Sequence, residues 1–182
     1  MNKYFTIITI SILSLAFTMV NDWEIFQYEA GKFRIEMPDL PTVSTQLLSS
    51  KIGDLEMHIF MHEGEAGIDD NILYMLNYTD YPETVVNADN MDKAAMKTFF
   101  TNSINGAVNN MDGELKAEKE IEVLGKPGRE VTIHYLNGEA IMRMQIILLK
   151  NRMFTLQTIA LAANDDNEAQ KRFFNSLEFI EN

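Results

Sequence analysis

Residues 115–162 read LKAEKEIEVLGKPGREVTIHYLNGEAIMRMQIILLKNRMFTLQTIALA. Four segments with strand-like alternation are separated here by short turn sequences, which is typical of an antiparallel meander. The pair Asn137-Gly138 is the clearest hairpin signal, because both residues tolerate a positive φ angle, and Asn151-Arg152 predicts a second tight turn. Gly125–Gly128 predicts the turn before the second strand. The apolar run Ile146–Leu149 indicates a strand that is covered on both faces.

The chain before this meander predicts five more strands and one long helix. The strands are expected at residues 23–28, 33–37, 42–50, 55–61 and 72–79. The helix is expected between Ala88 and Met111, capped by Asp89 or Asn90, because apolar residues recur there every three or four positions. This stripe consists of Met96, Phe99, Phe100, Ile104, Ala107, Val108 and Met111.

A short C-terminal helix is expected after Asn164 or Asp165, with Phe173 and Leu177 on its apolar side. Both helices must bury their apolar sides on the sheet. The sequence therefore predicts an α+β fold in which an antiparallel sheet is flanked by a long central helix and a short C-terminal helix.

Composition excludes several kinds of chemistry. The 182 residues include no cysteine, which excludes disulfides, thiol nucleophiles, cysteine-ligated zinc and iron–sulfur clusters. It also excludes lipid attachment through a cysteine. Lys and Arg number 15 against 27 Asp and Glu, for a formal net charge of −12. Such a surface repels phosphate backbones and anionic lipids, so we expect no nucleic-acid binding and no membrane binding by the mature domain.

The first twenty residues have the features of an export signal. Lys3 precedes an uncharged, mainly apolar run from Phe5 to Val20, and polar residues resume at Asn21. Residues 1–20 are therefore expected to be a signal peptide, with an uncleaved anchor as the alternative. Either interpretation exports residues 21–182, a single domain, to the periplasm or the cell exterior.

Four motifs give the chain a resemblance to a known family. They are Gly31–Pro38, Gly125–Glu130, Asn151–Leu156 and Arg172–Phe179. In this order they resemble the PsbP-like family of small exported bacterial proteins (Mog/PsbP-type), in its function-poor bacterial branch. The resemblance implies an α/β/α sandwich and a domain without enzymatic activity. Plant and cyanobacterial relatives assist photosystem II, and we carry no residue of that role over to this chain.

The most plausible ligand site is the acidic loop His62–Asn71. Glu63, Glu65, Asp69 and Asp70 carry the hard oxygen ligands that calcium prefers, although their spacing is not that of an EF-hand, and a solvated hairpin loop is the competing interpretation. His58 and His62 are four residues apart. Because four steps along a strand cover about 13 Å, this pair is not expected to share one ion.

The remaining candidates favour structural roles. Met57, Met61, Met142 and Met144 have thioethers that suit copper(I), but their strand-like alternation favours core packing. Arg129 and Glu130 are interpreted as a structural pair or as part of a groove. No Gly-x-Ser-x-Gly elbow or phosphate-binding loop is present.

We therefore expect a cell-envelope accessory or binding protein that is not an enzyme, needs no cofactor, and meets an envelope protein or a small ligand. The alternative is a calcium-type metal-binding or hydrolytic protein built on the acidic loop.

Overall fold

The computed structural model describes residues 23–50 and 52–180, and the expected signal of residues 1–20 lies outside them. These residues form two antiparallel sheets and two α-helices. The large sheet has the spatial order β3 (Thr42–Ser50), β4 (Gly53–Glu63), β5 (Asn71–Asp80), β9 (Arg152–Leu161), β8 (Ala140–Leu149), β7 (Lys126–Tyr135) and β6 (Glu114–Val123). The small sheet consists of β1 (Glu24–Tyr28), β2 (Phe33–Met37) and β10 (Glu178–Phe179).

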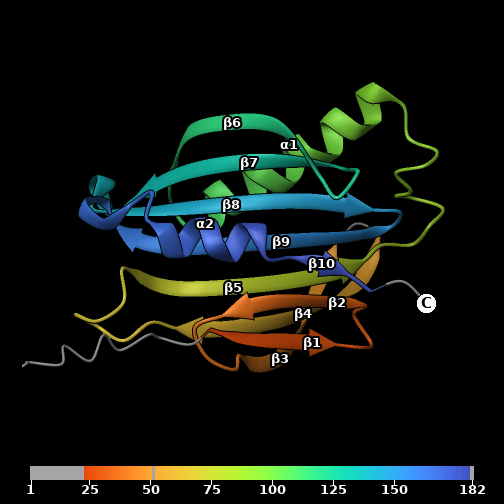
Figure 1. The fold of residues 1–182 in the computed structure, drawn as a ribbon. Helices are drawn as coiled ribbons and strands as arrows, with labels where there is room; N and C mark the ends of the chain where they lie inside the picture. Colours follow the sequence, from red (N-terminus) through yellow and green to blue (C-terminus); the bar gives the residue numbers. More distant parts are fainter. Residues whose placement is uncertain (1–22, 51, 181–182) are drawn as a thin grey trace, which may run out of the picture.

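The large sheet is the middle of three layers (Figure 1). We call its front face the one covered by the small sheet and α2 (Glu168–Asn175), and its back face the one on which α1 (Lys93–Asn110) lies. The front core is built on aromatic side chains, including Phe33, Phe60 and Phe173, which are fully buried. The back core joins Phe100 of α1 to apolar residues of β7 and β8. The expected α+β fold, with one helix on each face, is therefore confirmed.

The apolar run Ile146–Leu149 lies in β8, which has a neighbouring strand on each side. Ile146 and Leu148 are buried in the back core and Ile147 in the front core. The prediction that this strand is covered on both faces is confirmed.

Several predicted boundaries were wrong, each for a local reason. The β6–β7 turn is Leu124-Gly125, both with positive φ angles, so the strand already begins at Lys126 and includes Gly128. The β8–β9 turn is Lys150-Asn151, so Arg152 belongs to β9. The hairpin predicted at Asn137-Gly138 joins β7 to β8, but the connection is residues 136–139, in which Leu136–Gly138 form a short 3-10 turn.

The helix caps also lie later than predicted. The Asp92 carboxylate accepts the Ala95 N–H at 2.8 Å, so α1 begins at Lys93 and not after Asp89 or Asn90. The side chain of Asn167 accepts the Gln170 N–H at 2.8 Å and caps α2, where Asn164 or Asp165 was expected.

The predicted stripe of α1 is confirmed. Phe100 and Ile104 are buried against the back of the sheet, and the other five stripe residues pack around them. No helix within residues 23–50 and 52–180 is both long and apolar enough to cross a membrane.

Candidate functional site

A groove of about 1010 Å³ opens at one end of the sheets, where three hairpin turns and the C-terminal strand meet. We call it the turn groove. The β1–β2 turn contributes Ala30, Gly31 and Lys32, the β6–β7 turn contributes Leu124 and Lys126, and the β8–β9 turn contributes Leu149 to Arg152. Asp80 at the end of β5 and Glu178, Phe179 and Ile180 complete the lining.

Arg152 joins several of the segments that line the turn groove. Its guanidinium donates two hydrogen bonds of 2.6 Å to the carboxylate of Asp80 and one of 2.8 Å to the carbonyl oxygen of Gly31. It also lies over the ring of Tyr78, 4.3 Å from the centroid. The bonds to Asp80 raise the pKa of Arg152 above its ordinary value. Because these contacts join β9, β5 and the β1–β2 turn, Arg152 acts as a structural clamp.

Other contacts fix the positions of the turns that line the groove. The Ile180 N–H donates to the Lys32 carbonyl at 2.9 Å, which ties the C-terminal segment to the β1–β2 turn. The side-chain amide of Asn151 donates to the Tyr81 carbonyl at 2.7 Å. At Gly31 a Cβ atom would lie 2.7 Å from the Phe33 ring, so only glycine allows this close approach. The groove is therefore largely preformed.

The charge of the groove is opposite to that of the protein. Four cations line it, Lys32, Lys126, Lys150 and Arg152, against the two carboxylates of Asp80 and Glu178. Both carboxylates are already paired with arginines, Asp80 with Arg152 and Glu178 with Arg34. Lys126 and Lys150 add positive charge to the lining beside these two ion pairs.

Two of these lysines occupy strained backbone positions. Lys32 and Lys150 both have a φ of 54°, a left-handed conformation that costs a residue with a side chain roughly 1–2 kcal/mol. Glycine and asparagine adopt it more readily. Lysine is thus not the residue that the turn geometry itself favours, although other turns of the protein place Leu124, Leu136 and Asp112 in the same conformation.

The lining also contains exposed apolar side chains. Leu124 is 54% exposed on one turn. Leu149, Phe179 and Ile180 of the lining are partly buried. An arrangement of ammonium groups beside an apolar wall suits an organic anion that has an apolar portion.

The sequence analysis did not predict this groove, although several of its residues belong to the four motifs quoted above. Each of the four motifs of the resemblance contributes to it, through Lys32, Lys126, Arg152 and Phe179. A signal was present, since three hairpin turns each carry a lysine within or directly beside the turn. That the three turns lie close together in space depends on the order of the strands, which the turn sequences do not specify.

The acidic loop does not form a comparable site. Strand β4 extends to Glu63 and β5 begins at Asn71, so the loop is 64–70 and not His62–Asn71. The carboxylate of Asp69 accepts the backbone N–H of Glu65 at 2.7 Å. In the part of the chain that the structure describes, no three His, Asp or Glu side chains are grouped to hold a metal ion, and Glu63, Glu65, Asp69 and Asp70 are included in that statement.

The histidines have aromatic and acidic neighbours. His58 stacks on Tyr78 with ring centroids 4.5 Å apart, and its Nε2 lies 3.0 Å from Glu56. His62, predicted in a loop, lies in β4 instead and faces Tyr74. Burial raises the pKa of the Tyr74 hydroxyl to about 12, while its hydrogen bond from Asn71 acts in the opposite direction.

Arg129 and the four methionines singled out in the sequence only partly follow their predictions. Arg129 pairs with Glu118 and Glu120 of β6 and lies over the Phe100 ring, so a pair with Glu130 was wrong. Met142 and Met144 are buried in the back core as predicted. Met57 and Met61 are half-buried on the back of β4 and do not belong to either core cluster.

Comparison with known proteins places this architecture among PsbP-like folds. The structure is similar to the solution structure of cyanobacterial PsbP (CyanoP) from Synechocystis sp. PCC 6803, with a TM-score of 0.53, 9% identity, and coverage of 92% of this chain and 98% of that one. A protein of unknown function from Pseudomonas aeruginosa, PA94, matches with a TM-score of 0.44 and 10% identity over 88% of this chain and 99% of that one. No family model and no curated protein sequence matches the chain. At these identities the likeness to CyanoP shows the fold alone.

Proposed function

We propose that this protein is an exported, non-catalytic binding module of the cell envelope, of the PsbP-like family, that holds a small organic anion with an apolar portion in the turn groove. The observation that carries this proposal is the local reversal of charge. In a chain of formal charge −12, two turns distant in sequence bring Lys126 and Lys150 to one groove.

Two features of the groove support binding over catalysis. Its lining includes no histidine, serine, threonine or cysteine in the described part of the chain. Its two carboxylates are held by arginines and are not placed as a free acid–base pair. Export is supported by Lys3 and the apolar run from Phe5 to Val20.

Isothermal titration with octanoate tests the proposal, with acetate and octylammonium as probes that lack the apolar chain or the negative charge. We expect octanoate to bind more tightly than either. The variant Lys126→Glu/Lys150→Glu should weaken octanoate binding at least about tenfold, because it reverses two charges in the groove. Lys93→Glu/Lys97→Glu, which makes the same change on the exposed side of α1, is the matched control. Equal losses in both variants would refute the site.

A further inference from the structure

The two edges of the large sheet differ in how they are protected from pairing with another chain. Strand β6 has six charged residues in ten, Glu114, Lys116, Glu118, Lys119, Glu120 and Glu122, and its register is broken by a bulge between Leu115 and Ala117. Strand β3 has the sequence TVSTQLLSS, without charge or proline, and pairs with β4 over nine residues without a break. Charges and bulges are the usual means by which proteins block an open edge. Only β6 has them.

The open edge is nine residues long and well exposed. Strand β3 lies at the end of the strand order, with β4 as its single neighbour among the described strands. Eight of its nine residues are exposed. Its outer backbone N–H and C=O groups are therefore available to another extended chain.

The side chains of β3 are arranged symmetrically about Thr45. Val43 and Leu47 lie two residues to either side of Thr45, on the front face, and are 50% and 71% exposed. If a second β3 pairs antiparallel with Thr45 opposite Thr45, each Val43 lies directly opposite a Leu47. Cross-strand pairs of this kind are the stabilising unit of a sheet. The strand is thus self-complementary in one register.

The lack of charge on β3 is compatible with the same partner. Two copies of a chain with formal charge −12 repel each other, and an uncharged edge is where this repulsion opposes contact least. We infer that β3 is a pairing surface for a second copy of this chain, in an isologous dimer whose two-fold axis passes between the two Thr45 residues. The two large sheets then form one continuous sheet.

Sedimentation velocity tests the association with the protein produced from its complete sequence, its processed form being established by intact mass. Over roughly 1–200 μM we expect a concentration-dependent shift from monomer to dimer. Leu47→Lys places two ammonium groups at the pairing surface and should raise the dissociation constant at least about tenfold. Ala117→Lys, a change at an exposed position of β6, should leave it unchanged. A monomer at every concentration, or a dimer unaffected by Leu47→Lys, overturns the inference.

Cross-linking tests the register, because a cysteine-free chain allows single cysteines to be introduced without background. Directly opposed residues have Cα atoms about 4.5–5.5 Å apart, within the range of a disulfide. Thr45→Cys should therefore give a disulfide-linked dimer under mild oxidation. Ser49→Cys lies on the same edge, but in this register its two copies are separated by eight residues, or about 27 Å, and it should not cross-link. Equal yields from both variants overturn the register and with it the proposed dimer.

Discussion

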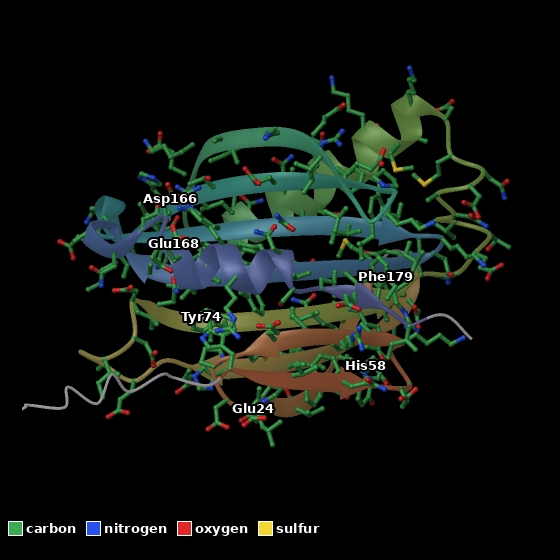
Figure 2. All side chains as sticks on the ribbon, viewed as in Figure 1. Glu24, His58, Tyr74, Asp166, Glu168 and Phe179 are labelled. Carbon is green, nitrogen blue, oxygen red and sulfur yellow. The ribbon has the colours of Figure 1, made fainter. Side chains whose placement is uncertain are left out.

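The turn groove and the opposite end of the large sheet differ in the charges that they expose, although the same strands run between them. At one end, the turn groove gathers four cations against two paired carboxylates. At the other end, which we call the acidic end, the loop 64–70 and the segment 162–168 expose carboxylates that include Glu65, Asp70, Asp166 and Glu168. Figure 2 shows Phe179 near the first end and Asp166 and Glu168 at the second.

This difference limits what net charge can exclude. A formal charge of −12 argues against a partner that contacts a broad surface, such as a nucleic acid. It does not argue against a small anion in a groove, because the potential inside a groove is set by the charges that line it. Net charge is therefore a good guide to whether the protein binds a large charged partner, and a poor guide to whether a small ligand binds at one site.

Comparing the two ends assumes that the sheets and helices that join them unfold as one cooperative unit. The substitution Phe100→Ala is the most severe test of this assumption. Phe100→Ala should reduce the free energy of unfolding by about 3–5 kcal/mol, because the buried ring is lost and a cavity remains. Lys97→Ala, on the exposed side of α1, should change it by less than about 0.5 kcal/mol. Urea unfolding should be followed by far-UV circular dichroism and by the fluorescence of Trp23, the single tryptophan. Separate transitions for the two probes would show that the ends are not one unit.

Most strands and both helices could be predicted from the sequence because their patterns lie within single segments. The apolar run in β8 and the three- and four-residue spacing in α1 can each be read from a single segment. The small sheet was not predicted as separate, and β10 was missed, because a two-residue strand has no pattern of its own. The turn groove could not be located, because Lys32 and Lys150 become neighbours only through the order β1-β2-β10 and the packing of that sheet on β9.

Two bidentate ion pairs allow the ends to be compared directly. Arg152 pairs with Asp80 at the turn groove, and Arg143 pairs with Asp165 at the acidic end through two bonds of 2.8 Å. Arg152→Met should destabilise the fold by about 2–3 kcal/mol, since the Gly31 carbonyl and the Tyr78 ring also lose their partner. Arg143→Met should cost about 1–2 kcal/mol. Urea midpoints give the stabilities, and octanoate titration should show weaker binding only for Arg152→Met. Weaker octanoate binding in Arg143→Met as well would mean that binding in the groove depends on the overall stability of the protein and not on Arg152 itself.

The pair at the acidic end also predicts a dependence on pH. Hydrogen bonds from Arg143 lower the pKa of Asp165 below its ordinary value. The stabilisation is therefore present above the pKa of an unfolded aspartate, about 3.9, and is lost as the pH falls through the lower folded-state pKa. We expect the difference in stability between the wild type and Asp165→Asn to shrink in this acidic range. Urea unfolding at pH 7 and at pH 3 measures it, and a difference that is constant with pH would contradict the assignment.

Single neutralisations sharpen the charge comparison further. Lys126→Gln and Lys150→Gln should each weaken octanoate binding by roughly three- to tenfold, which corresponds to about 1 kcal/mol. Asp70→Asn, at the acidic end, and Glu139→Gln, in the β7–β8 turn bonded to it at Ala162, should change it by less than about twofold because salt screens exposed charges beyond roughly 8–10 Å. If all four variants shifted the affinity similarly in the direction of their charge, net charge and not the groove would control binding.

Calcium should have the smallest effect of all. The acidic end has the oxygen ligands that calcium uses, but Glu63, Glu65, Asp69 and Asp70 are not grouped around one point, and Asp69 is engaged by the Glu65 N–H. Millimolar calcium, or a chelator, should therefore shift the thermal midpoint by less than about 1 °C, since a ligand stabilises only the state that binds it. Glu65→Gln/Asp69→Asn serves as the control. A rise of several degrees on adding calcium, abolished in that variant, would mean that the loop rearranges around the ion. The acidic end would then be a second binding site in its own right, and the contrast between the ends would be one of ligand charge.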